Sequence, residues 1–243
     1  MNLLIDIGNS NCKAAFEEGG RMGEMFRSPR RDVLNFLLEV LGGRRMDVIV
    51  LSNVREEDPE MERCLAERCR RLVVLDDRTE LPVKLKYDFP SRGLGADRIA
   101  GALAAAMLFP GKDCLKFDFG TALTVDFIDR DGTFRGGNIS LGMQSRFRAL
   151  NAFTGRLPLI GPDPEFGEIG VNTTGAMTAG VVLGLKFEVE GYLQQNPCRT
   201  AVFTGGDAFY FAKKLKNPIF VVQNLVLIGL AQIADYYARG ENE

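Results

Sequence analysis

Two short stretches of the sequence place a carboxylate, a glycine and a polar side chain directly after an apolar run. The first is Asp6-Ile7-Gly8-Asn9-Ser10, and the second is Asp118-Phe119-Gly120-Thr121. Glycine lets the backbone approach a ligand closely, and successive N–H groups in such a turn form a concavity that binds phosphate. A carboxylate repels phosphate, so each aspartate fits as a ligand for a cation that neutralises the phosphate charge.

Either turn taken alone is also explained as an ordinary hairpin in which the aspartate caps its own backbone. An internal repeat favours the functional interpretation. Residues 3–21 resemble residues 115–133, and the two stretches begin 112 residues apart, nearly half of the 243-residue chain. We therefore expect a duplicated domain, with halves 1–112 and 113–243 and a ligand cleft between them.

A third candidate segment is the loop and helix start around Asp97 and Arg98, which Gly93 and Gly95 keep open. An aspartate in the first turn of a helix is commonly just a favourable partner of the helix dipole. However, the chain contains no histidine, which excludes any Ser-His-Asp or Cys-His mechanism. A general base must then be a carboxylate or, less readily, Lys, Tyr or Cys, which makes Asp97 the candidate base.

A glycine pair, Gly205-Gly206, follows the apolar run of residues 201–204 and precedes a helical pattern. Backbone amides at such a strand-to-helix turn suit a nucleotide. The alternative is a plain turn with Asp207 as the helix N-cap. A GxxxxGK(S/T) motif is absent from the sequence, which excludes a P-loop enzyme.

Strand and helix patterns alternate along the chain, which predicts an α/β fold with largely parallel pairing. The predicted strands are Leu3–Ile7, Lys13–Glu17, Val48–Leu51, Leu72–Leu75, Val83–Tyr87, Cys114–Phe119, Leu123–Ile128 and Ala201–Thr204. The predicted helices are Asp32–Leu41, Glu57–Arg71, Ala96–Phe109, Ser145–Phe153, Thr174–Gln194, Asp207–Leu215 and Leu225–Arg239.

The composition is that of an ordinary globular protein, with 46% hydrophobic and 26% charged residues. A net charge of −2 gives no reason to expect a nucleic acid or an anionic membrane surface as a partner. The five cysteines form no CxxC pair, and we interpret them as reduced thiols of a cytoplasmic protein.

In order along the chain, these motifs resemble the type III pantothenate kinases of the acetate and sugar kinase/Hsp70/actin superfamily. The resemblance rests on residues 6–10 with Lys13, Tyr87 with Pro90, and Gly95-Ala96-Asp97-Arg98. It continues through residues 118–126, Gly136-Gly137 with Ile139, Leu157-Pro158 and residues 170–173. Leu141 stands where the family has proline, and the segment from Tyr87 to Asp97 is one residue longer than in the family.

The resemblance implies two actin-like, ribonuclease H-like halves with ATP in the cleft, and phosphorylation of pantothenate to 4′-phosphopantothenate on the way to coenzyme A. It implies that ATP is bound by Asp6, Ile7, Gly8, Asn9, Ser10, Asn11, Cys12, Lys13 and Thr121. It implies that pantothenate is bound by Tyr87, Gly95, Ala96, Asp97, Arg98 and Thr173.

Further roles follow from the same resemblance. Asp6 would position Mg²⁺ with the phosphates, and Asp118 would hold a monovalent cation, K⁺ or NH₄⁺. Asp97 would take the proton from the pantothenate hydroxyl, and Thr173 would reach pantothenate across the interface of a homodimer.

Two other functions remain open from the sequence. The first is a kinase for a different small metabolite, which a substrate panel would reveal. The second is a regulator that binds nucleotide without transferring phosphate, although Asp97, as a candidate base, has no purpose in a pure binding protein.

Overall fold

The computed structural model describes residues 1–29, 32–82, 85–87, 93–162 and 166–240, with the side chains of Lys86 and Tyr87 excepted. Pro90 and part of the predicted strand Val83–Tyr87 lie outside the described residues. The chain forms two compact units. The first comprises Met1–Pro110, Asp131–Phe134 and the chain from Asn224, and the second comprises Gly111–Arg130 and Arg135–Gln223. The division into halves 1–112 and 113–243 stays a prediction about the sequence repeat.

The first unit is built on a five-stranded sheet of order β3-β2-β1-β4-β5. Its strands are β1 (Asn2–Ile7), β2 (Asn11–Glu18), β3 (Arg21–Pro29), β4 (Met46–Asn53) and β5 (Cys69–Val74). The pairs β1–β2 and β2–β3 are antiparallel, whereas β1–β4 and β4–β5 are parallel. The carboxyl ends of β1 and β4 therefore lie side by side.

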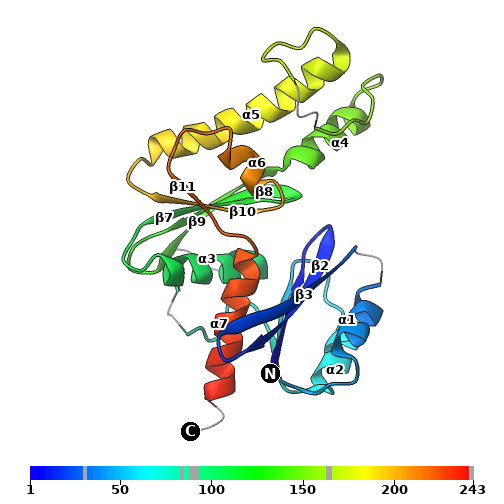
Figure 1. Ribbon diagram of the computed structural model, residues 1–243, viewed down its shortest axis with the longest axis vertical. Helices are drawn as coiled ribbons and strands as arrows, with labels where there is room; N and C mark the ends of the chain where they lie inside the picture. Colours follow the sequence, from blue (N-terminus) through cyan, green and yellow to red (C-terminus); the bar gives the residue numbers. More distant parts are fainter. Residues whose placement is uncertain (30–31, 83–84, 88–92, 163–165, 241–243) are drawn as a thin grey trace. The chain divides into compact units, whose positions relative to one another are not determined.

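Four helices accompany this sheet: α1 (Val33–Leu41), α2 (Pro59–Ala66), α3 (Ala96–Leu108) and α7 (Leu225–Arg239). One core cluster joins Leu3, Ile5 and Ile7 of β1 to apolar side chains of α1 and α2, which lie on the same side of the sheet in Figure 1. Because strand side chains alternate between faces, Leu4 and Asp6 point to the opposite face. Helix α7 packs on β1 and β4 and also against α3.

The sheet of the second unit repeats this strand order as β9-β8-β7-β10-β11. Beyond β9, β6 (Lys86–Tyr87) pairs with Thr133 and Phe134, and all four of these residues belong to the first unit. The repeated strands are β7 (Cys114–Phe119), β8 (Ala122–Ile128), β9 (Thr133–Leu141), β10 (Thr200–Gly205) and β11 (Ile219–Val221). Pairing is antiparallel for β7–β8 and parallel for β7–β10 and β10–β11. The same strand order, and the same directions in these three pairs, confirm the duplication that the two Asp-Gly turns predict.

The core of the second unit lies between one face of its sheet and α4 (Met143–Phe153), α5 (Thr173–Gln195) and α6 (Ala208–Ala212), as Figure 1 shows. Phe117, Phe119 and Phe203 form a stacked and tilted aromatic group at its centre. Because these side chains alternate with their neighbours, Lys116 and Asp118 project from the other face of β7.

The predicted helix Glu57–Arg71 is wrong beyond residue 66. Helix α2 ends at Ala66, and Cys69–Val74 instead forms β5, in which Cys69 pairs with Met46 of the parallel strand β4. The strands β3, β9 and β11 were not predicted. Among the described residues, no helix has both the length and the apolar character needed to cross a membrane.

Candidate active site

The first turn connects β1 to β2, and Asp6 lies one residue before the end of β1. In the sheet Asp6 pairs with Lys13 of β2 and Ser52 of β4. Asp6 is buried, with 8% of the residue exposed, and Ser52 Oγ donates a hydrogen bond to Asp6 Oδ1 at 3.4 Å. The Gly8 amide donates to the Asn11 carbonyl at 3.0 Å and closes the turn, leaving Asn9 and Ser10 exposed at its tip.

Cys12 and Lys13 follow this turn on β2, and they differ in their surroundings. The Lys13 ammonium donates to Asn224 Oδ1 at 3.5 Å, which anchors it beside the N-terminus of α7. Burial, aided by the negative charge of Asp6 and opposed by Arg55, raises the pKa of the Cys12 thiol to about 12. Cys12 therefore stays protonated near neutral pH and cannot act as a thiolate nucleophile.

Asp97 and Arg98 begin helix α3 in the same unit. Asp97 Oδ1 accepts a hydrogen bond from the Arg98 amide at 2.8 Å, and both side chains are half-buried. A Cβ on Gly95 would lie 4.0 Å from Cγ1 of Val54, the residue after β4. The Val54 amide donates to the Ile7 carbonyl at 3.2 Å. The start of α3 thus adjoins the carboxyl ends of β1 and β4. Tyr87 lies on β6, and its side chain is outside the described residues.

The second turn connects β7 to β8 and is held by the start of α4. The Thr121 carbonyl accepts two hydrogen bonds, from the Gly142 amide at 3.0 Å and from Ser145 Oγ at 2.6 Å. A Cβ on Gly142 would lie 2.0 Å from the Gly120 carbonyl oxygen, so only glycine fits there. The Thr121 side chain remains exposed, where a ligand can reach it.

The end of β10 approaches the second turn closely at Gly205. This residue has φ +91°, and a Cβ would lie 2.5 Å from Asp118 Oδ1 and 2.6 Å from the Phe119 amide nitrogen. Asp207 stands at the N-cap position of α6 but makes no capping hydrogen bond with its side chain. Burial raises the pKa of the Asp207 carboxyl group. Gly205 therefore serves close packing, whereas a Cβ on Gly206 would meet nothing within 4 Å. Asp207 occupies the N-cap position that the plain-turn alternative expects, although its side chain makes no capping hydrogen bond.

A buried ion pair lies two residues before Asp118 on the same face of β7. Lys116 pairs in register with Asp126 of β8, and Lys116 Nζ lies 2.7 Å from Asp126 Oδ2. The two side chains are 1% and 0% exposed. The equivalent pair in the first unit is Leu4 and Ala15, so the charges are specific to the second unit.

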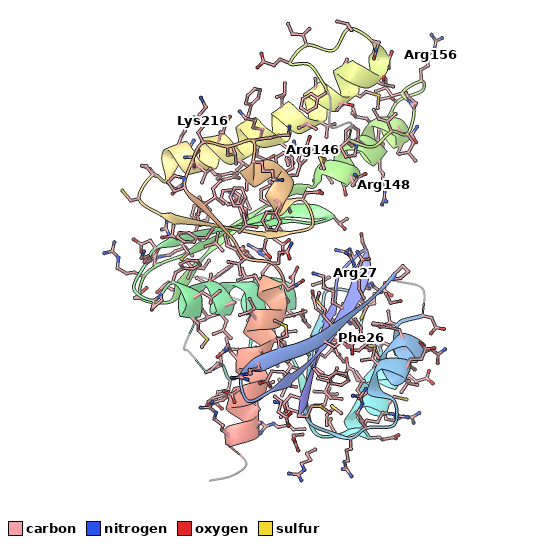
Figure 2. The ribbon with its side chains drawn as sticks, viewed as in Figure 1. Phe26, Arg27, Arg146, Arg148, Arg156 and Lys216 are labelled. Atoms are coloured by element: carbon pink, nitrogen blue, oxygen red, sulfur yellow. The ribbon has the colours of Figure 1, made fainter. Side chains whose placement is uncertain are left out.

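Thr173 is the first residue of α5. It is exposed and lines an apolar groove of about 840 Å³ between α4 and α5. Arg146, labelled in Figure 2, spans these helices by an ion pair with Glu188 of α5. Phe153 and Val171 are large apolar residues of this region with exposures of 89% and 94%.

In the first unit, the structure brings the predicted residues of the first turn together with Asp97 and Arg98. In the second unit, it brings Asp118 and Thr121 together. Sequence reasoning missed Arg55, which donates from Nε and Nη2 to the Gly8 carbonyl at 2.9 and 2.6 Å. It also missed Asn224 and the role of Gly142. No local sequence signal indicates Arg55, because the pairing of β1 with β4 that brings it to the turn is decided by the tertiary structure.

The carboxylates of the two turns are the groups that could associate with a cation bound to phosphate. No cluster of three or more His, Cys, Asp and Glu side chains that could hold a metal occurs in the part of the chain that the structure describes. Mg²⁺ typically binds through one or two carboxylates together with substrate phosphates. Asp6 at the first turn supplies a carboxylate of this kind.

The chain is similar to known proteins over nearly its whole length. Residues 2–195 match the type III pantothenate kinase family. A type III pantothenate kinase of Phocaeicola vulgatus is 43% identical, covering 97% of this chain and 98% of the relative. One from Porphyromonas gingivalis is 38% identical, with the same coverage.

Solved structures also share the fold. A conserved Baf family protein from Campylobacter jejuni has a TM-score of 0.68 at 23% identity, covering 98% of this chain and 99% of that one. The apo pSK41 ParM protein has a TM-score of 0.56 at 9% identity, covering 100% of this chain and 99% of that one. At these identities the similarity shows the fold alone, and the predicted class of duplicated actin-like halves is confirmed.

The buried ion pair generates a stability prediction. Replacing Lys116 with Met leaves the Asp126 carboxylate buried without its cation, which we expect to cost about 3–5 kcal/mol of unfolding free energy. The double variant Lys116→Met/Asp126→Leu removes both charges and should recover most of that loss. Urea denaturation of wild type and both variants measures the effect. Equal losses in the single and double variants would contradict a charge-based explanation.

Proposed function

The chain belongs to the type III pantothenate kinase family, and from that premise we propose the residues by which it phosphorylates pantothenate with ATP. The observation that carries the proposal is the pair of equivalent Asp-Gly turns at the carboxyl ends of β1 and β7. Phosphoryl transfer depends on positioning and on charge neutralisation, and turns of this kind supply both.

The first turn binds the phosphates in this proposal. Backbone amides and side chains from Gly8 to Lys13 donate to phosphate oxygens, and the anchored Lys13 ammonium adds positive charge. Asp6 positions Mg²⁺, which neutralises the phosphate charge when bound. Thr121 contacts ATP from the second turn, supported by its exposed side chain and its doubly held carbonyl.

Asp97 serves as the general base. The pantothenate hydroxyl attacks the γ-phosphorus, its proton passes to Asp97, and ADP leaves. Arg98, with the backbone of Gly95 and Ala96, binds the substrate, and a guanidinium suits the carboxylate of pantothenate. The position of this helix start beside Val54, next to the end of β1, supports the assignment. Tyr87 is proposed as a further substrate contact.

Asp118 holds a monovalent cation, K⁺ or NH₄⁺, in this proposal. Its support is the position of Asp118 at the second turn, equivalent to that of Asp6 at the first. We also propose a cytoplasmic location, which agrees with the five free cysteines.

We propose a homodimer in which Thr173 reaches the pantothenate bound by the partner subunit. The apolar groove beside Thr173 and the exposed Phe153 support this, since a contiguous apolar surface commonly marks a protein interface.

The reaction is tested by measuring ADP release from ATP, Mg²⁺ and K⁺, with and without pantothenate, and by detecting the phosphorylated product by mass. We expect release that depends on pantothenate and falls sharply when Na⁺ replaces K⁺. Release with a different acceptor from a substrate panel would favour another small-metabolite kinase. Nucleotide binding without any phosphorylated acceptor would favour the regulator.

The base assignment makes a second prediction. Asp97→Asn should lower kcat by at least about 100-fold while ATP still binds, because only the proton acceptor is lost. Asp58→Asn is the matched control, since Asp58 caps α2 and asparagine caps almost as well. Turnover of Asp97→Asn close to that of the control would remove Asp97 from the role of base.

The dimer is tested by placing a charge on its apolar surface. Phe153→Asp should give a monomer by light scattering and raise the KM for pantothenate, because the partner's Thr173 is lost. Phe187→Asp is the control, since Phe187 is also exposed, at 60%, but does not line the groove. A dimer that persists in Phe153→Asp, or dissociates equally in the control, would refute this interface.

A further inference from the structure

Arg55 makes an unusual contact with the first turn. Its Nε and Nη2 atoms both donate to one acceptor, the Gly8 carbonyl oxygen, at 2.9 and 2.6 Å, and the two residues are 47 positions apart. Hydrogen bonds from a charged donor are about twice as strong as neutral ones. The half-buried guanidinium therefore fixes the direction of this carbonyl firmly.

The local structure after β4 places Arg55 for this contact. The Val54 amide continues the ladder by donating to the Ile7 carbonyl at 3.2 Å. Asn53 then makes a tight turn, with Oδ1 accepting from the Arg55 amide at 3.0 Å and Nδ2 donating to the Glu56 carbonyl at 3.2 Å. Arg55 is thus held beside the turn by its backbone as well as by its side chain.

The geometry of the peptide group turns this contact into an effect on ligand binding. The Gly8 carbonyl and the Asn9 N–H belong to the same planar trans peptide, so they point in opposite directions. Holding the carbonyl toward Arg55 directs the Asn9 N–H to the other side, at the tip where Asn9 and Ser10 are exposed. A hydrogen bond to the carbonyl also polarises the peptide and strengthens its N–H as a donor.

Arg55 also contributes charge at a turn that carries a buried carboxylate. The negative charge of Asp6 raises the pKa of the Cys12 thiol, and the positive charge of Arg55 lowers it. The Asp6 carboxylate repels a phosphate that approaches the first turn, and the Arg55 guanidinium offsets this repulsion by attracting the phosphate. The second unit has Gly205, Gly206 and Asp207 at the corresponding end of β10, so this arginine is specific to the first turn.

We propose that Arg55 is a positioning residue for nucleotide phosphate: it holds the Gly8 carbonyl so that the amides of the first turn face the phosphate. The proposal rests on the proposed function of this turn in binding ATP. It predicts that loss of Arg55 weakens binding of ATP and leaves binding of pantothenate unchanged.

The test compares Arg55→Met and Arg55→Lys with Arg44→Met. Arg44 is the matched control because its Nε and Nη2 also donate to backbone carbonyls, those of Leu41 and Val40 at the end of α1. KM for ATP, KM for pantothenate and kcat are measured well below each melting temperature. Calorimetric titration with a non-hydrolysable ATP analogue measures nucleotide binding without requiring turnover.

We expect Arg55→Met to raise the KM for ATP and the Kd of the analogue by roughly tenfold or more, as for a lost charged hydrogen bond. Arg55→Lys, which keeps the charge and one donor, should recover part of the loss, and Arg44→Met should change neither constant. Unchanged ATP constants in a folded Arg55→Met protein would overturn the proposal. Because the titration needs no pantothenate, a wild type without kinase activity would refute the proposed function separately from the role of Arg55.

Discussion

The parallel pairing of β1 with β4, and of β7 with β10, is the constraint on which the candidate site depends. In each pair the aspartate of the first strand stands opposite a hydroxyl residue of the second, Asp6 with Ser52 and Asp118 with Thr204. The same ladders carry the chain segments after β4 and β10 to the adjacent turns. The contact of Arg55 with Gly8 and the close approach of Gly205 to Asp118 both follow from this register.

The two units share one strand topology, but different contacts hold their turns in place. In the first unit, a charged guanidinium from beyond β4 holds the turn through the Gly8 carbonyl. In the second, the start of α4 holds the Thr121 carbonyl, and Gly205 allows backbone to pack against Asp118. The first unit thus has a turn held by a charged side chain, and the second has a turn held by backbone and hydroxyl groups.

The buried Lys116–Asp126 ion pair is a further difference between the sheets of the two units. Burying two charges is costly, and well-packed apolar residues such as Leu4 and Ala15 at the equivalent place in the first unit avoid that cost. The pair lies two residues from Asp118 on the same face of β7. The pair therefore places two compensating charges in the same sheet as the proposed cation site, where the first unit has apolar side chains at the equivalent positions.

The sequence by itself determined the features that depend on residues close together in the chain. These include the two Asp-Gly turns, the repeat that reveals the duplication, the start of α3 at Asp97, and β7 and α7 with their observed bounds. The short or exposed strands β3, β9 and β11 escaped prediction because they lack a strong apolar alternation. Only the tertiary structure decided that Arg55 reaches Gly8, that Lys116 meets Asp126, and that Gly205 packs on Asp118. The physical reason is that strand register brings together residues distant in sequence, and no local pattern records which strands pair.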